Sequence, residues 1–210
     1  MKSILLIGNS GGIGHALQGT LEARGAKVTG LSRRDTGLDL SDEASIEGQL
    51  SALSGPFDAI LVASGALEIN GARPEKALSQ LTQSALVGQF IVNAAGPALI
   101  LKHAPRLLPK DRPSQFAALS ARVGSIGDNK IGGWYSYRAA KAALNQIIHT
   151  GAIELARTHK QAVCVALHPG TGQTPFTAKY LGRHPSVPAA QAALNLLSVL
   201  EGLGPDKTGQ

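Results

Sequence analysis

The sequence predicts an α/β fold in which a parallel sheet is covered by helices on both faces. Short apolar runs of strand length alternate with longer segments of helical periodicity along the 210 residues. Strands separated by helices of ten or more residues form βαβ units, whose strands pair in parallel. The strand candidates are almost continuously apolar, as expected when helices cover both faces of a sheet. Since no repeat, linker or low-complexity stretch interrupts this pattern, we expect one domain spanning residues 1–210.

The elements are expected in the following order. Strands are predicted at 3–8, 27–32, 57–64, 115–120 and 161–168. Helices are predicted at 15–24, within 39–53, and at 75–86, 88–108, 134–158 and 188–202. In the second helix Ser41 is the expected N-cap, and Asp42 and Glu43 lie in the first turn, where acidic side chains interact favourably with the helix dipole.

Charge and composition argue against several classes of protein. The net charge is +6, but the basic residues are scattered along the sequence and aromatic residues make up only 4%, which does not favour a nucleic-acid-binding surface. No apolar run is long enough to span a bilayer, and the N-terminus does not resemble a signal peptide. The single cysteine, Cys164, excludes an internal disulfide and is expected to be a buried, inert thiol. We therefore expect a cytoplasmic protein that binds neither nucleic acid nor a membrane.

A glycine-rich loop, GNSGGIG at residues 8–14, connects the first strand to the first helix. Its glycines let the backbone turn tightly and approach a pyrophosphate, and the helix N-terminus supplies N–H donors and the positive end of the dipole. Many such turns only connect elements, but this one starts an α/β chain, which favours a dinucleotide site. The residues expected to bind the cofactor here are Gly8, Ser10, Gly12, Ile13 and Gly14.

The end of the second strand indicates which dinucleotide is bound. NAD sites usually place an acid there to hold the ribose 2′-hydroxyl, whereas this chain has Ser32, Arg33 and Arg34. A guanidinium suits a 2′-phosphate, so NADP(H) is the expected cofactor and NAD(H) the alternative. A solvated basic turn without a ligand is the competing interpretation. Asp39, which precedes Leu40, is expected to accept a hydrogen bond from the adenine amino group.

Tyr137 and Lys141 are four residues apart in the helical segment GGWYSYRAAKAALN. Residues at this spacing lie on one face of a helix. A phenol has a pKa near 10, and an ammonium one turn away favours its phenolate form. A lone pair of this kind often arises by chance, so it gains weight only from the other motifs. Tyr135 has no lysine four residues later and is expected to pack or to border the pocket.

Several ordered motifs together resemble the short-chain dehydrogenase/reductase family over nearly the whole chain, and its small C-factor-like members most of all. The matching pieces are the loop at 8–14, Asp39, Asn93 in FIVNAAG, LSARVGSIGDN at 119–129, the segment that carries Tyr137 and Lys141, and HPGTGQT at 168–174. The resemblance implies a Rossmann-type doubly wound parallel sheet with strand order 3-2-1-4-5-6.

The resemblance also implies a reaction, the interconversion of a carbonyl and an alcohol by hydride transfer. Tyr137 would be the proton donor or acceptor, Lys141 would also hold the nicotinamide ribose, and Asn93 would anchor a water relay to Lys141. Further cofactor contacts are expected from Gly65, Pro169, Gly170 and Thr174. His168 is expected to be a structural residue at a strand end.

The family pattern further implies a homodimer or homotetramer. The predicted helices 88–108 and 134–158 are long and carry many small residues. In the family these helices pair across a two-fold axis.

Three departures from the family pattern concern the site and the sheet. Ala121 stands where the family has its catalytic serine; Ser125 is the expected replacement, while Ser120 should face away from the site if the strand alternates. The usual Asn-Asn-Ala-Gly is VASG at 62–65, which keeps only the glycine. The sequence stops at DKTGQ, 206–210, before the last strand of the family pattern, either as a natural short form or as a truncated one.

Two functions therefore remain open on this fold. The first is an NADP(H)-dependent oxidoreductase, which the intact Tyr137, Lys141 and Asn93 favour. The second is a nucleotide-binding signalling or regulatory protein with little or no turnover, which Ala121 favours. The segment 175–188 is expected to form a lid over a partly apolar substrate pocket, through Phe176, Tyr180 and Leu181.

Overall fold

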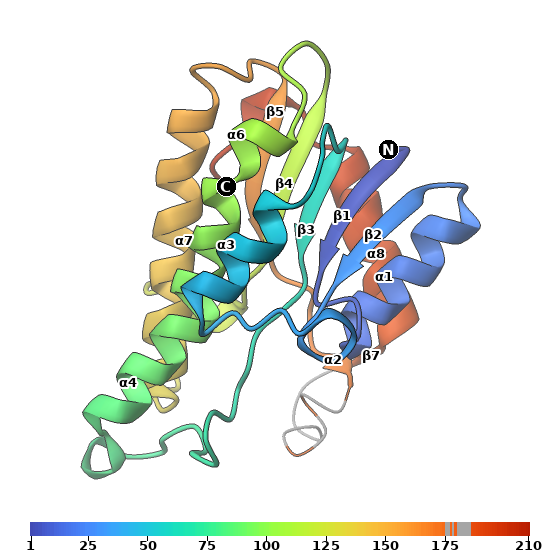
Figure 1. Cartoon of the computed structure of the whole chain (residues 1–210). Helices are drawn as coiled ribbons and strands as arrows, with labels where there is room; N and C mark the ends of the chain where they lie inside the picture. Colours follow the sequence, from blue (N-terminus) through green and yellow to red (C-terminus); the bar gives the residue numbers. More distant parts are fainter. Residues whose placement is uncertain (175–176, 178, 180–185) are drawn as a thin grey trace.

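The computed structural model describes residues 1–174, 177, 179 and 186–210. A five-stranded parallel sheet lies at its centre, with the strand order β2–β1–β3–β4–β5 (Figure 1). The strands are β1 (Ser3–Ile7), β2 (Lys27–Leu31), β3 (Ala59–Val62), β4 (Ser114–Leu119) and β5 (Ala162–Leu167). All five agree with the predicted strands to within two residues.

The order in which successive strands are added to the sheet changes direction at β1. β2 pairs with one edge of β1 and β3 with the other, so that Leu5 lies opposite both Thr29 and Ile60. This confirms the doubly wound order, although in the described part of the chain no strand pairs with the outer edge of β2, the outermost position of the order 3-2-1-4-5-6. Because the connections after β1 and β3 diverge, they open a crevice at the carboxyl ends of the strands.

Helices form a layer on each face of the sheet (Figure 1). One layer contains α3 (Glu43–Ser51), α5 (Gly96–Lys102) and α7 (Tyr135–Leu155), and the other contains α1 (Gly12–Ala23) and α8 (Ala189–Glu201). Leu5 and Ile7 of β1 belong to the first core and Ile4 and Leu6 to the second. This burial on both faces explains why the strands are continuous apolar runs.

The helical segment that precedes β4 differs from the prediction. Residues 75–86 contain a short 3₁₀ turn, η1 (Leu78–Gln80), and the long helix starts only at α4 (Gln83–Phe90). Its N-cap is Thr82, whose hydroxyl accepts a hydrogen bond from the Ala85 N–H at 3.2 Å. The helix continues through a π-helical segment, η2 (Ile91–Ala95), into α5, and α6 (Ala104–Leu107) follows. The predicted break at residue 87 is therefore wrong, because the capping hydroxyl lies five residues earlier.

This continuous helix also corrects an expectation about membranes. The stretch Gln83–Lys102 is long and apolar enough to cross a membrane by length and composition alone. Polar residues such as Gln89 and Asn93 divide it into short apolar runs in the sequence. Both of these side chains are buried in the fold, although only 33% of the apolar stretch is buried, and one such helix is weak evidence for a membrane span.

The cap of α3 also differs from the prediction. Ser41 does not cap the helix but donates its N–H and hydroxyl to Asp39, at 2.8 and 2.7 Å. The N-cap is Asp42, whose carboxylate accepts a hydrogen bond from the Ala44 N–H at 3.0 Å. The prediction named the right turn and the wrong residue, because either side chain can accept a bond from a helix N-terminus.

Several short elements were not predicted. They are α2 (Arg33–Thr36), the strand pair β6 (Gly172–Gln173) and β7 (Val187–Pro188), and the 3₁₀ turns η3 (Arg122–Gly124) and η5 (Pro205–Lys207). After η5, the Gly209 N–H donates to the Cys164 carbonyl and the Ala166 N–H donates to the Gln210 carbonyl, each at 2.8 Å. These bonds cover the outer edge of β5, where no further strand pairs in the described residues.

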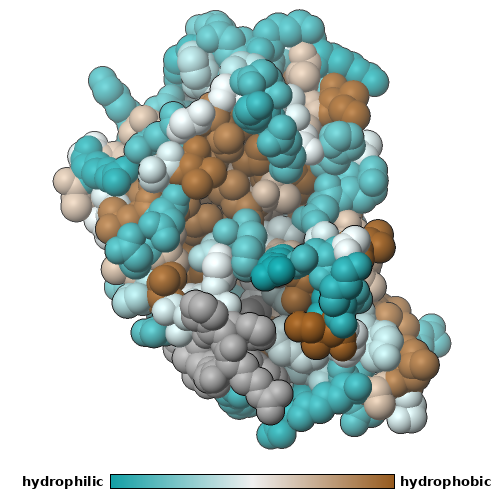
Figure 2. All heavy atoms as spheres, turned by 180° about the vertical axis from the view of Figure 1, so that it is seen from behind, coloured by the Kyte–Doolittle hydropathy of each residue, from teal (hydrophilic) through white to brown (hydrophobic). Residues whose placement is uncertain are grey.

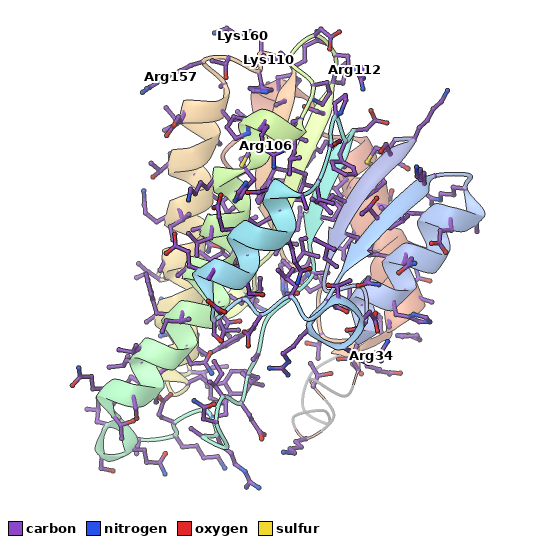
Figure 3. All side chains as sticks on the ribbon, in the orientation of Figure 1. Arg34, Arg106, Lys110, Arg112, Arg157 and Lys160 are labelled. Atoms are coloured by element: carbon purple, nitrogen blue, oxygen red, sulfur yellow. The ribbon has the colours of Figure 1, made fainter. Side chains whose placement is uncertain are left out.

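Basic residues that are scattered in the sequence gather at one end of the folded chain. Figure 3 shows Arg106, Lys110, Arg112, Arg157 and Lys160 toward the end of the molecule opposite Arg34. Arg106 donates to the carbonyls of Leu50 and Leu53 at the C-terminal end of α3, at 2.8 Å each, so this side chain serves the fold itself.

The surface also carries apolar side chains. Seen from the opposite side, apolar residues form separate groups among polar ones (Figure 2). Large apolar side chains with high exposure include Leu86, Val87 and Phe90 on α4, Ile153 on α7, and Ile126 and Ile131 between η3 and α7.

Candidate active site

A cleft of about 1280 Å³ opens at the carboxyl ends of the strands. It brings together most of the predicted cofactor and catalytic residues: Gly8, Ser10, Gly12, Ile13, Ser32, Arg33, Asp39, Leu40, Gly65, Tyr137, Lys141, Pro169, Gly170 and Thr174 all line it. Gly14, Asn93 and Ser125 do not. The predicted lid residues Phe176, Tyr180 and Leu181 lie outside the described residues.

The glycine loop is packed so closely that side chains would not fit. A Cβ atom on Gly8, whose φ is +87°, would lie 2.3 Å from Ser64 Oγ, and one on Gly12 would lie 2.7 Å from Thr174 Cγ2. A Cβ on Gly14 would lie 2.0 Å from the Gly8 carbonyl oxygen, so this glycine lets α1 pack against the loop without lining the cleft. Gly11 is the N-cap of α1 and supplies no side-chain cap, which leaves first-turn N–H groups for a ligand. These features fit the pyrophosphate of a dinucleotide.

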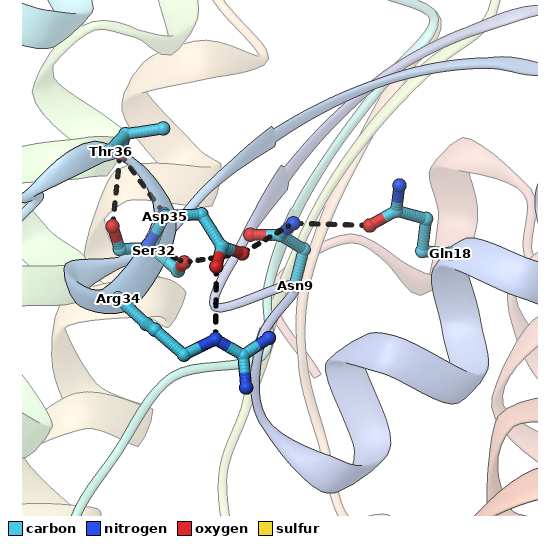
Figure 4. Close-up of polar contacts among 6 residues, drawn as sticks. All are labelled: Asn9, Gln18, Ser32, Arg34, Asp35 and Thr36. Carbon is cyan, nitrogen blue, oxygen red and sulfur yellow. Dashed lines mark hydrogen bonds and ion pairs between the residues drawn. The ribbon is translucent and has the colours of Figure 1, made fainter.

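Two adjacent arginines at the end of β2 have different environments. Arg34 donates from Nε to Asp35 at 2.9 Å, and the same carboxylate accepts bonds from Ser32 Oγ at 3.1 Å and Asn9 Nδ2 at 3.4 Å (Figure 4). These bonds, that from Arg34 above all, lower the pKa of Asp35. Arg33 lines the cleft and has no hydrogen-bond partner among the residues that the structure describes. Arg33 is thus the guanidinium that is available to a bound anion.

Asp39 lies on the same side of the cleft as Arg33. Its carboxylate accepts two hydrogen bonds from Ser41, which lower its pKa, and the charge of Arg33 acts in the same direction. An ionised carboxylate at this position can accept a hydrogen bond from an amino group, as predicted for the adenine ring.

Tyr137 and Lys141 lie on one face of α7 and are both buried, with 6% and 3% of their surfaces exposed. Lys141 Nζ lies 5.8 Å from the centroid of the Tyr137 ring and donates to the Leu119 carbonyl at 2.9 Å. Burial lowers the pKa of Lys141 to about 8 and raises the pKa of Tyr137 above its ordinary value. The expectation that Lys141 lowers the pKa of Tyr137 is therefore not met in the chain without ligand, because desolvation dominates both groups.

Asn93 lies behind the cleft wall and holds its backbone. The side chain is fully buried in η2, accepts a bond from the Ala66 N–H at 3.1 Å and donates to the Ala66 carbonyl at 2.8 Å. It also donates to Gln89 Oε1 at 2.7 Å. A Cβ on Gly65 would lie 2.8 Å from Asn93 Oδ1 and 3.7 Å from Lys141 Nζ, so Asn93 and Lys141 meet at this glycine. π-Helical segments are frequent at functional sites, and here one carries Asn93.

The three residues considered for the serine role have different positions. Ala121 lines the cleft and offers no hydroxyl. Ser120 also lines it, but its hydroxyl donates to Asn145 Oδ1 on α7 at 2.6 Å. Ser125 is exposed outside the cleft, and its hydroxyl accepts a bond from the Asp128 N–H at 3.3 Å. The structure does not bring Ser125 to Tyr137, because η3 turns the chain away after Ala121.

One buried contact at the start of α7 was missed by the sequence analysis. The carboxylate of Glu75 is buried and accepts bonds from the Ser136 hydroxyl and, at 3.2 Å, from the Ser136 N–H in the first turn of α7. The Glu75 carbonyl accepts a further bond from the Trp134 N–H at 2.5 Å. Trp134, the N-cap, has φ +54° and supplies no side-chain cap. A lone glutamate 61 residues before its partner gives no local sequence signal.

Comparison with known proteins supports one family. No family model matches the chain. A 1-hydroxy-2-glutathionyl-2-methyl-3-butene dehydrogenase of Rhodococcus sp. (strain AD45) is 28% identical in an alignment of 226 residues, gaps included, that covers 100% of this chain and 95% of that protein. The C-signal protein of Myxococcus xanthus is 32% identical over 137 residues, which cover 64% of this chain and 77% of that protein.

The fold comparison agrees with the sequence comparison. The crystal structure of a short-chain dehydrogenase/reductase from Burkholderia multivorans with bound NADP superposes with a TM-score of 0.82 at 26% identity, covering 100% of this chain and 93% of that one. The doubly wound sheet, the glycine loop and the Tyr137–Lys141 pair are common to the prediction and the structure. The chain belongs to the short-chain dehydrogenase/reductase family of oxidoreductases.

Proposed function

We propose that this protein is an NADP(H)-dependent oxidoreductase that interconverts a carbonyl and an alcohol. In the direction of reduction, a carbonyl compound, NADPH and one proton give an alcohol and NADP⁺. The observation that carries the proposal is the placement of Tyr137 and Lys141, buried side by side on α7, in the wall of the cleft that also contains the glycine loop. Related proteins are named dehydrogenases and reductases, and one related structure holds NADP.

Different residues would bind the cofactor and transfer the proton. The loop at 8–14 and the first turn of α1 would hold the pyrophosphate, Arg33 the 2′-phosphate, and Asp39 the adenine. The cofactor supplies or accepts the hydride. Lys141, held by the Leu119 carbonyl, would bind the nicotinamide ribose, and Pro169, Gly170 and Thr174 would border the nicotinamide end.

Tyr137 would give a proton to the substrate oxygen during reduction and take it back during oxidation. Its raised pKa keeps the phenol protonated at neutral pH, which suits a proton donor. The ammonium of Lys141 would stabilise the phenolate that forms when the proton leaves.

The test is NADPH consumption with a panel of aldehydes and ketones, for the wild type and two tyrosine variants. Tyr137→Phe should abolish turnover and leave the Kd for NADPH within about twofold of the wild type. Tyr135→Phe is the matched control, because Tyr135 lies two residues away and does not line the cleft. Equal turnover by all three proteins would refute the role of Tyr137.

A second candidate function rests on Ala121. A cleft that binds NADPH but lacks the usual hydroxyl beside Tyr137 also suits a nucleotide-binding regulatory protein with little turnover. Tight NADPH binding, with no activity toward the panel in either direction, would favour that candidate.

A further inference from the structure

The hydroxyl that the family places beside the reacting oxygen has no counterpart in the described part of the cleft wall around residue 121. Ala121 has none, Ser120 uses its hydroxyl on Asn145, and Ser125 lies outside the cleft. If the proposed function holds, one hydrogen-bond donor to the substrate oxygen must come from another side chain or is absent. The present inference rests on that function and concerns where the donor lies.

His168 occupies the neighbouring position on the same wall. β4 and β5 pair in register through Leu119 and Leu167, and the Ser120 N–H donates to the Leu167 carbonyl at 2.7 Å. The two chains therefore leave the sheet side by side, and the continued register sets His168 beside Ser120, the residue that precedes Ala121. Both residues line the cleft that Tyr137 also lines.

The His168 ring is able to donate a hydrogen bond. The residue is exposed at the cleft wall, and no hydrogen bond to it occurs among the described residues. Burial, and secondarily the charge of Arg122, lower the pKa of His168 below 6.5. The Arg122 guanidinium is itself held by Asp128 through bonds of 2.5 and 3.1 Å. At neutral pH the imidazole is therefore uncharged and carries one N–H donor and one acceptor nitrogen.

We propose that His168 donates a hydrogen bond to the carbonyl oxygen of the substrate, and so replaces the serine that is missing at position 121. His168 keeps its proton throughout. The hydride goes to the carbonyl carbon, the proton comes from Tyr137, and the His168 N–H stabilises the negative charge that develops on the oxygen between these two transfers. A donor that already lies in the cleft wall is suited to this, since it needs little reorganisation as the charge develops.

The experiment compares four variants by kcat, by the Kd for NADPH and by thermal melting. His168→Ala should lower kcat by about 100-fold or more, the usual effect of removing one such donor, and should change the Kd for NADPH by less than about twofold. His168→Gln, which retains an N–H donor, should keep more activity than His168→Ala. Ala121→Ser in the His168→Ala background should recover at least about tenfold in kcat, because the serine hydroxyl restores a donor to the same oxygen. His149→Ala is the control, since His149 is exposed on α7 outside the cleft lining, and it should keep the kcat and the Kd for NADPH of the wild type.

The rescue separates a donor from a structural histidine. A His168→Ala protein that loses kcat and is not rescued by Ala121→Ser would overturn the proposal, whether or not it remains folded. If His168→Ala had the same kcat as an active wild type, this proposal alone would be overturned. A wild type without Tyr137-dependent turnover would overturn the proposed function, and the role of His168 with it.

Discussion

Lys141 Nζ lies 5.8 Å from the centroid of the Tyr137 ring and is bound to the Leu119 carbonyl at 2.9 Å, with 3% of the residue exposed. The chain thus keeps a desolvated ammonium beside a desolvated phenol. A lysine with a lowered pKa costs stability while it is charged, because the unfolded chain solvates the ammonium better. The cost of holding Lys141 in this position should therefore depend on pH.

The free energy of unfolding should show this dependence when the wild type is compared with Lys141→Met. The pKa of Lys141 falls from 10.5 to about 8 on folding, so between these pH values the unfolded chain binds more protons and the lysine term makes stability rise with pH. The full difference corresponds to on the order of 3 kcal/mol. Cys164 acts in the opposite direction above about pH 9, because burial raises the pKa of its thiol to about 12, but both proteins contain it. In urea unfolding from pH 7 to pH 10, the free energy of unfolding of the wild type should rise relative to that of Lys141→Met. A constant difference would contradict a lowered pKa.

Arg33 should determine the preference for NADPH over NADH. Its guanidinium lines the cleft without a hydrogen-bond partner in the described structure. A charge-assisted bond to a phosphate contributes roughly 1.5–3 kcal/mol, so Arg33→Ala should weaken NADPH binding by about tenfold to a hundredfold and leave NADH binding nearly unchanged. Isothermal titration with both cofactors measures this.

Arg34 provides the control for that titration. Its guanidinium is engaged with Asp35 and does not line the cleft, so Arg34→Ala should affect both cofactors equally and weakly. A loss of NADPH affinity in Arg34→Ala that equals the loss in Arg33→Ala would mean that general positive charge, and not a specific contact, attracts the cofactor.

Much of the fold and of the cofactor side of the site was predictable because the signals are local. The strand at 3–8 is an apolar run, the loop at 8–14 is defined by its glycines, and Tyr137 and Lys141 share a helix face by spacing alone. The order of the strands also followed from the family pattern, whereas the preference for NADP(H), inferred from the residues that end β2, stays a prediction.

The parts that were not predictable depend on contacts between distant residues or on competition between neighbours. Glu75 is buried against Ser136, which lies 61 residues later in the sequence. The segment that begins at Glu75 consequently does not form the helix predicted at 75–86. Ser125 looked like a donor because the sequence does not show that η3 turns it out of the cleft. The burial that raises the pKa of Tyr137 is also a property of the packed structure and not of the helical spacing.

The contact between Glu75 and Ser136 should stabilise the helix that carries Tyr137. Glu75→Gln and Ser136→Ala should each lower the free energy of unfolding by about 1–3 kcal/mol, since each leaves buried polar groups without a full set of partners. Because the two residues share their bonds, the double variant should lose less than the sum of the single losses. Chemical denaturation of the four proteins completes the cycle. Glu154→Gln, an exposed substitution on the same helix, should change stability by less than about 0.5 kcal/mol. Additive losses would show that Glu75 and Ser136 act independently.

The exposed apolar residues of α4 predict a homo-oligomer. Leu86, Val87 and Phe90 are 40–47% exposed on a helix that packs beside α7, where Ile153 is 54% exposed. Leu86, Val87 and Phe90 lie close together on α4, and exposed apolar side chains grouped in this way mark interaction surfaces, in line with the pairing of these helices that the family pattern implies. Light scattering at micromolar concentration should give at least twice the chain mass of 21.6 kDa.

Val87→Asp combined with Phe90→Asp should reduce the mass to that of a single chain, because two carboxylates cannot be buried unpaired at a symmetric interface. Leu78→Asp is the control, since Leu78 is 70% exposed but lies in η1, outside both helices, and it should leave the mass unchanged. A wild type that scatters as a monomer would contradict the prediction. An oligomer that survives the double substitution would place its interface on another face of the molecule.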